Sequence, residues 1–77
     1  MDIMEKVQEI FRDILDLEDL ILDGKTSAND LEEWDSLAHI NIIIAIELEF
    51  KTKFALGEIQ ELKNVEDMIE LIKSKIS

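Results

Sequence analysis

The sequence predicts an all-α protein, a four-helix bundle with three longer helices, one short helix and a long first loop. Its apolar residues recur at the spacing of helical faces, and no segment alternates apolar and polar residues as a half-buried strand does. The chain has no proline and only two glycines to interrupt these helices. Because 77 residues leave room for one modest core, residues 1–77 are expected to form a single free-standing domain.

The first helix is predicted from about residue 2 to residue 15, with charged residues on its outer face. Its apolar face consists of Ile3, Val7, Ile10, Phe11, Ile14 and Leu15. A long connection, residues 16–33, follows this helix, and Asp23-Gly24-Lys25 predicts a turn within it. Connections of this length are uncommon in compact domains. We therefore expect its leucines to pack on the core, with or without a short helical turn.

The second helix is expected to begin at Asp35, a good N-cap residue, and to continue to about Phe50, before Lys51-Thr52-Lys53. A short third helix is predicted between Leu56 and Leu62. The last helix starts at Asn64, whose side chain can cap the turn that follows. Its inward-facing residues are predicted to be Val65, Met68, Ile69, Ile72 and Ile76.

The second helix carries more apolar residues than one face can hold. One stripe consists of Ile42, Ile43, Ile46 and Phe50. A second stripe consists of Leu37, Ile40, Ile44 and Leu48. Either another helix buries this second stripe, or it is exposed for a partner. Ser36 lies at its edge, and a reactive position beside an apolar surface favours the docking interpretation.

Composition narrows the possible partners. A formal net charge of −11, from 19 acidic and 8 basic residues, disfavours binding to nucleic acid and to anionic membranes. The same charge favours proteins with basic patches as binding partners. The longest apolar run, Ile42–Ile46, is far shorter than the roughly 20 residues that cross a bilayer. The acidic N-terminus does not resemble a signal peptide, so we expect a soluble, cytoplasmic protein without membrane insertion.

The absence of cysteine excludes a disulfide framework and any thiolate chemistry of the chain itself. A thiol that the function requires must therefore come from outside. Ser36, at the predicted start of a helix, could carry a phosphate ester, which the positive end of a helix dipole stabilises. Asp35 could cap that helix or help to hold a divalent cation during phosphoryl transfer. The alternative is that both residues simply begin a helix.

Together these residues resemble the acyl carrier protein family. The resemblance rests on Asp35-Ser36-Leu37 at the head of a helix near the middle of a short acidic chain, and on the residues that follow, Ile40, Ile44, Ala45, Glu47, Glu49 and Phe50. It implies a four-helix bundle in which Ser36 carries 4′-phosphopantetheine. It also implies that a separate Mg²⁺-dependent phosphopantetheinyl transferase moves this group from coenzyme A. The protein would be a monomeric carrier, not an enzyme, and the arm would supply the missing thiol.

The resemblance also implies a docking surface for acyl-transferring or acyl-modifying enzymes with basic and apolar patches. Its apolar contacts would be Leu37, Ile40, Ile44 and Leu48, and its acidic contacts Glu47 and Glu49. Carriers of general fatty acid synthesis usually have acidic residues where this chain has Ala38, His39 and Asn41. The segment WDSLAHI is more similar to carriers of specialised pathways. Fatty acid, modified-lipid, polyketide and related biosynthesis therefore stay open as the pathway.

Other functions fit the residues less well. Ser36 and His39 lie three residues apart beside Asp35, but a helical neighbour pair without a nucleophile elbow or oxyanion donors does not make a hydrolase. The loop around Gly24 lacks the oxygen ligands of a calcium-binding loop. With one histidine and no cysteine, no metal site is expected. The serious alternative is a small acidic helical interaction module that is never modified.

Two residues near the motif have more than one possible role. His39 is either a partly buried helix residue or a contact for the arm or for a partner. Trp34 is expected to pack over the entry to the Ser36 helix, with a role in gripping the arm or a docked enzyme as the alternative.

Overall fold

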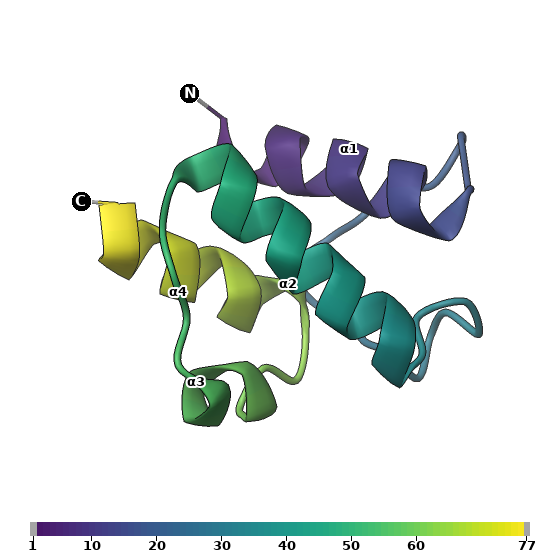
Figure 1. Cartoon of the computed structure of the whole chain (residues 1–77). Coiled ribbons are helices and arrows are strands. Elements are labelled where there is room, and N and C mark those ends of the chain that lie inside the picture. Colours follow the sequence, from purple (N-terminus) through teal and green to yellow (C-terminus); the bar gives the residue numbers. More distant parts are fainter. Residues whose placement is uncertain (1, 77) are drawn as a thin grey trace.

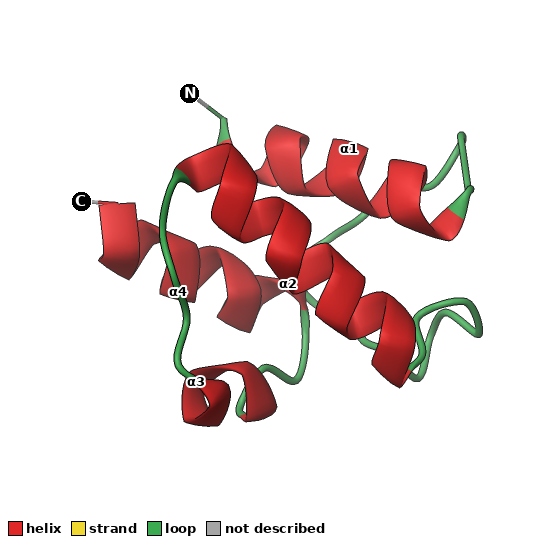
Figure 2. Ribbon diagram, in the orientation of Figure 1, coloured by secondary structure: helices red, strands yellow, loops and turns green. Residues whose placement is uncertain are grey.

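The structure is a computed structural model that describes residues 2–76. Its elements are α1 (Ile3–Leu15), α2 (Ser36–Phe50), α3 (Leu56–Gln60) and α4 (Val65–Ile76). Helix α1 packs against both α2 and α4, while the short α3 lies below them in Figure 1. Figure 2 shows helices and loops only, with no strand in residues 2–76. The predicted all-α bundle with three longer helices and one short helix is confirmed.

Side chains define the helix starts as the sequence predicted. Oδ1 of Asp35 accepts a hydrogen bond of 2.8 Å from the N–H of Ala38 at the head of α2. Oδ1 of Asn64 accepts one of 2.9 Å from the N–H of Asp67 at the head of α4. These bonds satisfy backbone donors that have no partner within the helix. Helix α3 ends at Gln60, two residues earlier than the sequence predicted.

The buried core draws on α1, α2, α4 and the connections between helices. Its members are Val7, Phe11, Leu15, Leu22, Trp34, Ile42, Ile43, Ile46, Phe50, Phe54, Val65, Met68, Ile69 and Ile72. The first stripe of α2 lies entirely within it. The prediction that Ile76 faces inward is wrong, because this side chain is 42% exposed. It is the last residue of α4, where the apolar period continues beyond the neighbours that could cover it.

The long first loop is fastened to α1 by two side chains. The Nε–H of Arg12 donates to the carbonyl oxygen of Leu20 at 2.6 Å. The N–H of Leu22 donates to Oε1 of Gln8 at 2.8 Å, and the Leu22 side chain is buried in the core. The remaining leucines of the loop are half-buried against that core, as predicted, whereas Ile21 is 79% exposed.

A second set of bonds joins the loop to the start of α4. The predicted turn at Asp23-Gly24-Lys25 is present, and Oδ1 of Asp23 accepts from the N–H of Lys25 at 2.8 Å. The N–H of Val65 donates to the carbonyl of Thr26, and the N–H of Glu66 donates to the carbonyl of Gly24, each at 2.9 Å. The loop forms turns but no helix, so its shape depends on these contacts. These hydrogen bonds hold the second half of the loop, which leads into α2, against the start of α4.

Candidate functional site

Ser36 is the first residue of α2, and its side chain is exposed. Asp35 fixes the helix end from both its side chain and its backbone: Oδ1 accepts from Ala38, and the carbonyl accepts from the N–H of His39 at 2.8 Å. Within residues 2–76, the hydroxyl of Ser36 forms no hydrogen bond. The site therefore offers an exposed hydroxyl on a capped helix end, where the dipole favours a phosphate ester.

Trp34 anchors the chain just before this serine. Its indole is 5% exposed and packs edge-on against Phe11, with the ring centroids 4.8 Å apart. The indole Nε1–H donates to Nδ1 of His39 at 3.0 Å, and the two rings are stacked with centroids 5.8 Å apart. The expected packing role of Trp34 is confirmed. Its bond to His39 was not predicted from the sequence, although a buried indole N–H needs an acceptor and an imidazole lies five residues away.

An open groove of about 710 Å³ lies beside Ser36. The start of α2 forms one wall through Ser36, His39 and Ile40, and α3 contributes Leu56 and Ile59 to another. An extended arm that is attached to the serine hydroxyl has room to lie in this groove or to point away from it. The residues present therefore fit a flexible prosthetic group on Ser36. The sequence did not indicate the groove, because α3 and the first turn of α2 are far apart along the chain.

The second apolar stripe of α2 is uncovered in the described chain. The exposed fractions are 69% for Leu37, 54% for Ile40, 49% for Ile44 and 75% for Leu48. On the opposite side of the helix, Ile42 and Ile46 are fully buried. Of the two interpretations of this helix, exposure of the second stripe is therefore the one observed. Such a contiguous apolar surface is typical of an interaction site.

The two acidic residues grouped with this stripe lie in different surroundings. Glu47 is half-buried, and its Oε2 accepts a hydrogen bond of 2.8 Å from the N–H of Phe54. Glu49 pairs with Lys6 of α1 at 3.3 Å. Because each residue turns a helix by about 100°, Glu49 lies well around the helix from Leu48, toward α1. The structure brings Glu47 to the edge of the stripe but leaves Glu49 apart from it.

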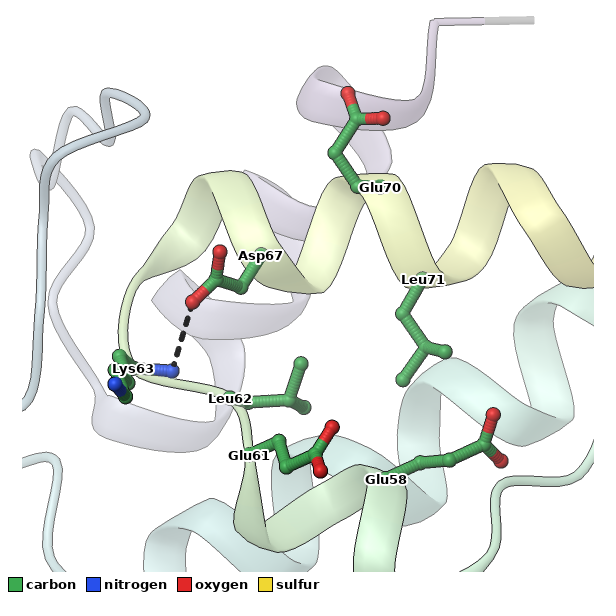
Figure 3. A pocket seen from close by; sticks show the side chains of 7 residues that line it. All are labelled: Glu58, Glu61, Leu62, Lys63, Asp67, Glu70 and Leu71. Carbon is green, nitrogen blue, oxygen red and sulfur yellow. Dashed lines mark hydrogen bonds between the residues drawn. The ribbon is translucent and has the colours of Figure 1, made fainter.

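A second hollow lies between α3 and α4, away from the serine (Figure 3). Its acidic side chains, among them Glu58, Glu61 and Glu70, point in different directions in Figure 3. Asp67 accepts a hydrogen bond of 3.2 Å from the N–H of Lys63 there. Across residues 2–76, no group of three or more such side chains is arranged to hold a metal ion. The carboxylate of Asp67 thus helps to fix the connection from α3 into α4.

No helix within residues 2–76 combines the length and the apolar character needed to cross a membrane.

Comparison with known proteins identifies the class of this fold and site. The family model described as "Phosphopantetheine attachment site" matches residues 5–72. The chain is thus a carrier that bears a phosphopantetheine prosthetic group. A curated acyl carrier protein from Thermosynechococcus vestitus is 32% identical over 99% of this chain and 94% of its own length. One from Petrotoga mobilis is 29% identical over 99% and 89%.

A solved structure agrees with these sequence matches. The solution structure of the holo acyl carrier protein from Geobacter metallireducens is 45% identical, with a TM-score of 0.91 over 99% of this chain and 87% of that one. The chain belongs to the acyl carrier protein family. The expected family, carrier role and 4′-phosphopantetheine group are confirmed, and the protein is a carrier and not a catalyst. Proteins of this family interact with a phosphopantetheinyl transferase and with enzymes that handle acyl groups.

Proposed function

We propose that Ser36 is the residue that carries 4′-phosphopantetheine, and that acyl intermediates travel on it as thioesters. The observation that carries this proposal is the free, exposed hydroxyl of Ser36 at the head of α2. The other two serines in residues 2–76 are engaged: the Ser27 hydroxyl donates to Asp30, and the Ser74 hydroxyl donates to the carbonyl of Leu71. When attached, the group supplies the thiol that this chain lacks.

Asp35 has two tasks in this proposal. Its Oδ1 caps α2 and so fixes the direction of the neighbouring Ser36. Its other carboxylate oxygen forms no hydrogen bond within residues 2–76 and is available to the Mg²⁺ that accompanies coenzyme A into the transferase. The serine hydroxyl attacks the β-phosphate of coenzyme A, loses its proton to a base of the transferase and releases 3′,5′-adenosine bisphosphate. The cation neutralises charge on the phosphates during this transfer.

The exposed stripe is the proposed docking surface for partner enzymes. Leu37, Ile40, Ile44 and Leu48 supply apolar area next to the attachment site. Glu47 at the stripe edge, and Glu49 farther around α2, supply negative charge for basic residues at the rim of the partner's site. We propose that the carrier acts as a monomer in the cytoplasm, and that successive enzymes cover the same stripe. Specialised acyl chains fit the proposal as well as fatty acids do.

The experiment that tests the attachment site is intact-mass analysis. The protein is incubated with coenzyme A, Mg²⁺ and a broad-specificity phosphopantetheinyl transferase. The native chain should gain the mass of one phosphopantetheine, Ser36→Ala should gain none, and Ser74→Ala should gain the same as the native chain. If Ser36→Ala is modified as fully as the native chain, the assignment is wrong.

A further inference from the structure

The bond between Trp34 and His39 fixes where the imidazole carries its proton. An indole N–H can donate but cannot accept, so Nδ1 of His39 is the acceptor in the 3.0 Å bond and carries no hydrogen. A neutral imidazole with a bare Nδ1 carries its hydrogen on Nε2. The burial of Trp34 and the stacking of the two rings hold the imidazole in this orientation. His39 therefore presents one oriented N–H donor.

This donor lies beside the attachment site. His39 lines the groove together with Ser36, and residues three apart are neighbours on a helix surface. Within residues 2–76, Nε2 of His39 accepts and donates no hydrogen bond, and no side-chain nitrogen there is buried without a partner. Nε2 is therefore not buried, and the imidazole that carries it lines the groove. Around α2, the uncovered stripe lies on one side of Ser36 and His39 lies on the other.

We propose that His39 is a positioning residue for the prosthetic group. Its Nε2–H donates a hydrogen bond to a phosphate oxygen of the arm on Ser36 and holds the arm in the groove, which of the docking stripe includes Ile40 but not Leu37, Ile44 or Leu48. This inference rests on the proposed attachment at Ser36. A phosphodiester is a strong acceptor for such a donor, and the bond is charge-assisted. The other charged groups that line the groove are Asp35, which repels the phosphate, and Lys63, which attracts it.

The arrangement gives the carrier two arm positions with different uses. With the phosphate bonded to His39, the arm lies along the groove lined by apolar side chains such as Leu56 and Ile59. A partner that docks on the stripe must break this bond to draw the arm into its own active site. His39 therefore sets the equilibrium between retention and delivery, and Trp34 sets the orientation of His39.

The inference is tested on protein whose loading at Ser36 has first been verified by mass. Long-range ¹H–¹⁵N correlation spectra identify the imidazole tautomer in the apo and holo forms. We expect the Nε2–H tautomer in both forms, and loading should slow exchange of this proton with water about tenfold. Contacts between His39 ring protons and the pantetheine methyl groups should appear in nuclear Overhauser spectra of the holo form. An Nδ1–H tautomer, or an unchanged Nε2 signal on loading, would overturn the inference.

Two variants separate positioning from structure. His39→Phe keeps a ring to stack on Trp34 but has no donor, so the ³¹P line of the arm should narrow as the arm becomes more mobile. Asn41→Ala changes an exposed residue two positions along α2 and should leave the ³¹P line unchanged. If His39→Phe is folded, loaded and identical to the native protein in its ³¹P spectrum, His39 does not position the arm. If loading fails at Ser36 itself, the proposed function fails instead.

Discussion

The carboxylate of Glu47, near the end of α2, accepts a hydrogen bond of 2.8 Å from the backbone N–H of Phe54 in the connection to α3. Phe54 is a core residue that is 9% exposed, so this bond helps to hold the connection against the bundle. Glu47 also lies at the edge of the proposed docking stripe. A partner that binds this carboxylate thus contacts a group that already has a structural task.

Glu47→Ala should lower the free energy of unfolding by about 1 to 2 kcal/mol, because it removes a charged acceptor from a half-buried N–H. Glu47→Gln should cost less, since its amide oxygen can still accept the bond. Urea unfolding followed by Trp34 fluorescence measures both. Glu49→Ala is the matched control: it breaks only the exposed pair with Lys6, and about 0 to 1 kcal/mol is expected. Equal effects of the two alanine variants would contradict the structural task of Glu47.

The helices could be predicted because each one carries its own local signals. The apolar period and the capping side chains of Asp35 and Asn64 are sequence features, and the structure confirms both caps. The apolar period also led to the wrong prediction that Ile76 is buried. A period specifies which face of a helix a residue lies on, but not whether a neighbouring element covers that face. The same ambiguity left two interpretations of the second stripe. In the structure the other elements pack on the opposite side of α2, so the second stripe is exposed.

The residues at the centre of the candidate site were predicted from the sequence, whereas the contacts that surround them were not. Ser36 and Asp35 stand out by position and residue type alone. The groove and the bonds of the first loop join residues that are distant in sequence, and no local pattern specifies them. Glu49 was grouped with the stripe by charge, although its rotation around α2 turns it toward Lys6. Which contacts form between distant segments depends on packing, which periodicity does not describe.

Ile44→Glu should leave the fold intact and impair transfer of acyl groups to partner enzymes. Ile44 is 49% exposed, and surface substitutions usually change stability by no more than about 0.5 kcal/mol. Ile46→Glu is the matched change on the other side of α2, where the side chain is fully buried, and it should unfold the protein. Circular dichroism checks both folds, and partner turnover is then measured for Ile44→Glu. If Ile44→Glu is unfolded, the stripe belongs to the core.

Asp35→Asn should slow loading of Ser36 by at least about tenfold while leaving stability nearly unchanged. Asparagine is as good an N-cap as aspartate, so the bond to Ala38 persists, but the negative charge available to Mg²⁺ is lost. Asp35→Ala removes both and should also lower the free energy of unfolding by about 1 kcal/mol. Loading rates by mass and melting curves measure the two effects separately. Normal loading of Asp35→Asn would leave capping as the only task of this residue.

Asp16→Gly should raise the free energy of unfolding by about 0.5 to 1 kcal/mol. Asp16 ends α1 in the left-handed region, with φ of 57°, where a side chain is strained and glycine is not. Its backbone N–H still donates to the carbonyl of Arg12 in the variant. Asp16→Val, with a β-branched side chain, should destabilise the protein. Urea unfolding of the two variants should give opposite signs, and a gain for valine would contradict the argument.

Acid should remove a stabilising contact that holds α3. Glu58 accepts from the N–H of Ala55 at 2.8 Å and pairs with Lys75 at 3.0 Å, which together lower the pKa of Glu58 below its ordinary value of 4.5. Because the folded-state pKa is the lower one, the contribution is complete above pH 4.5 and is lost as the pH falls through the folded-state pKa.

Native protein should therefore melt at a higher temperature than Glu58→Gln at pH 7, and this difference should shrink steadily below pH 4.5. Glu61→Gln, an exposed change on the same segment, is the control and should melt close to the native protein at pH 7. A melting difference for Glu58→Gln that stays constant down to pH values well below 4.5 would show that the carboxylate charge does not hold α3.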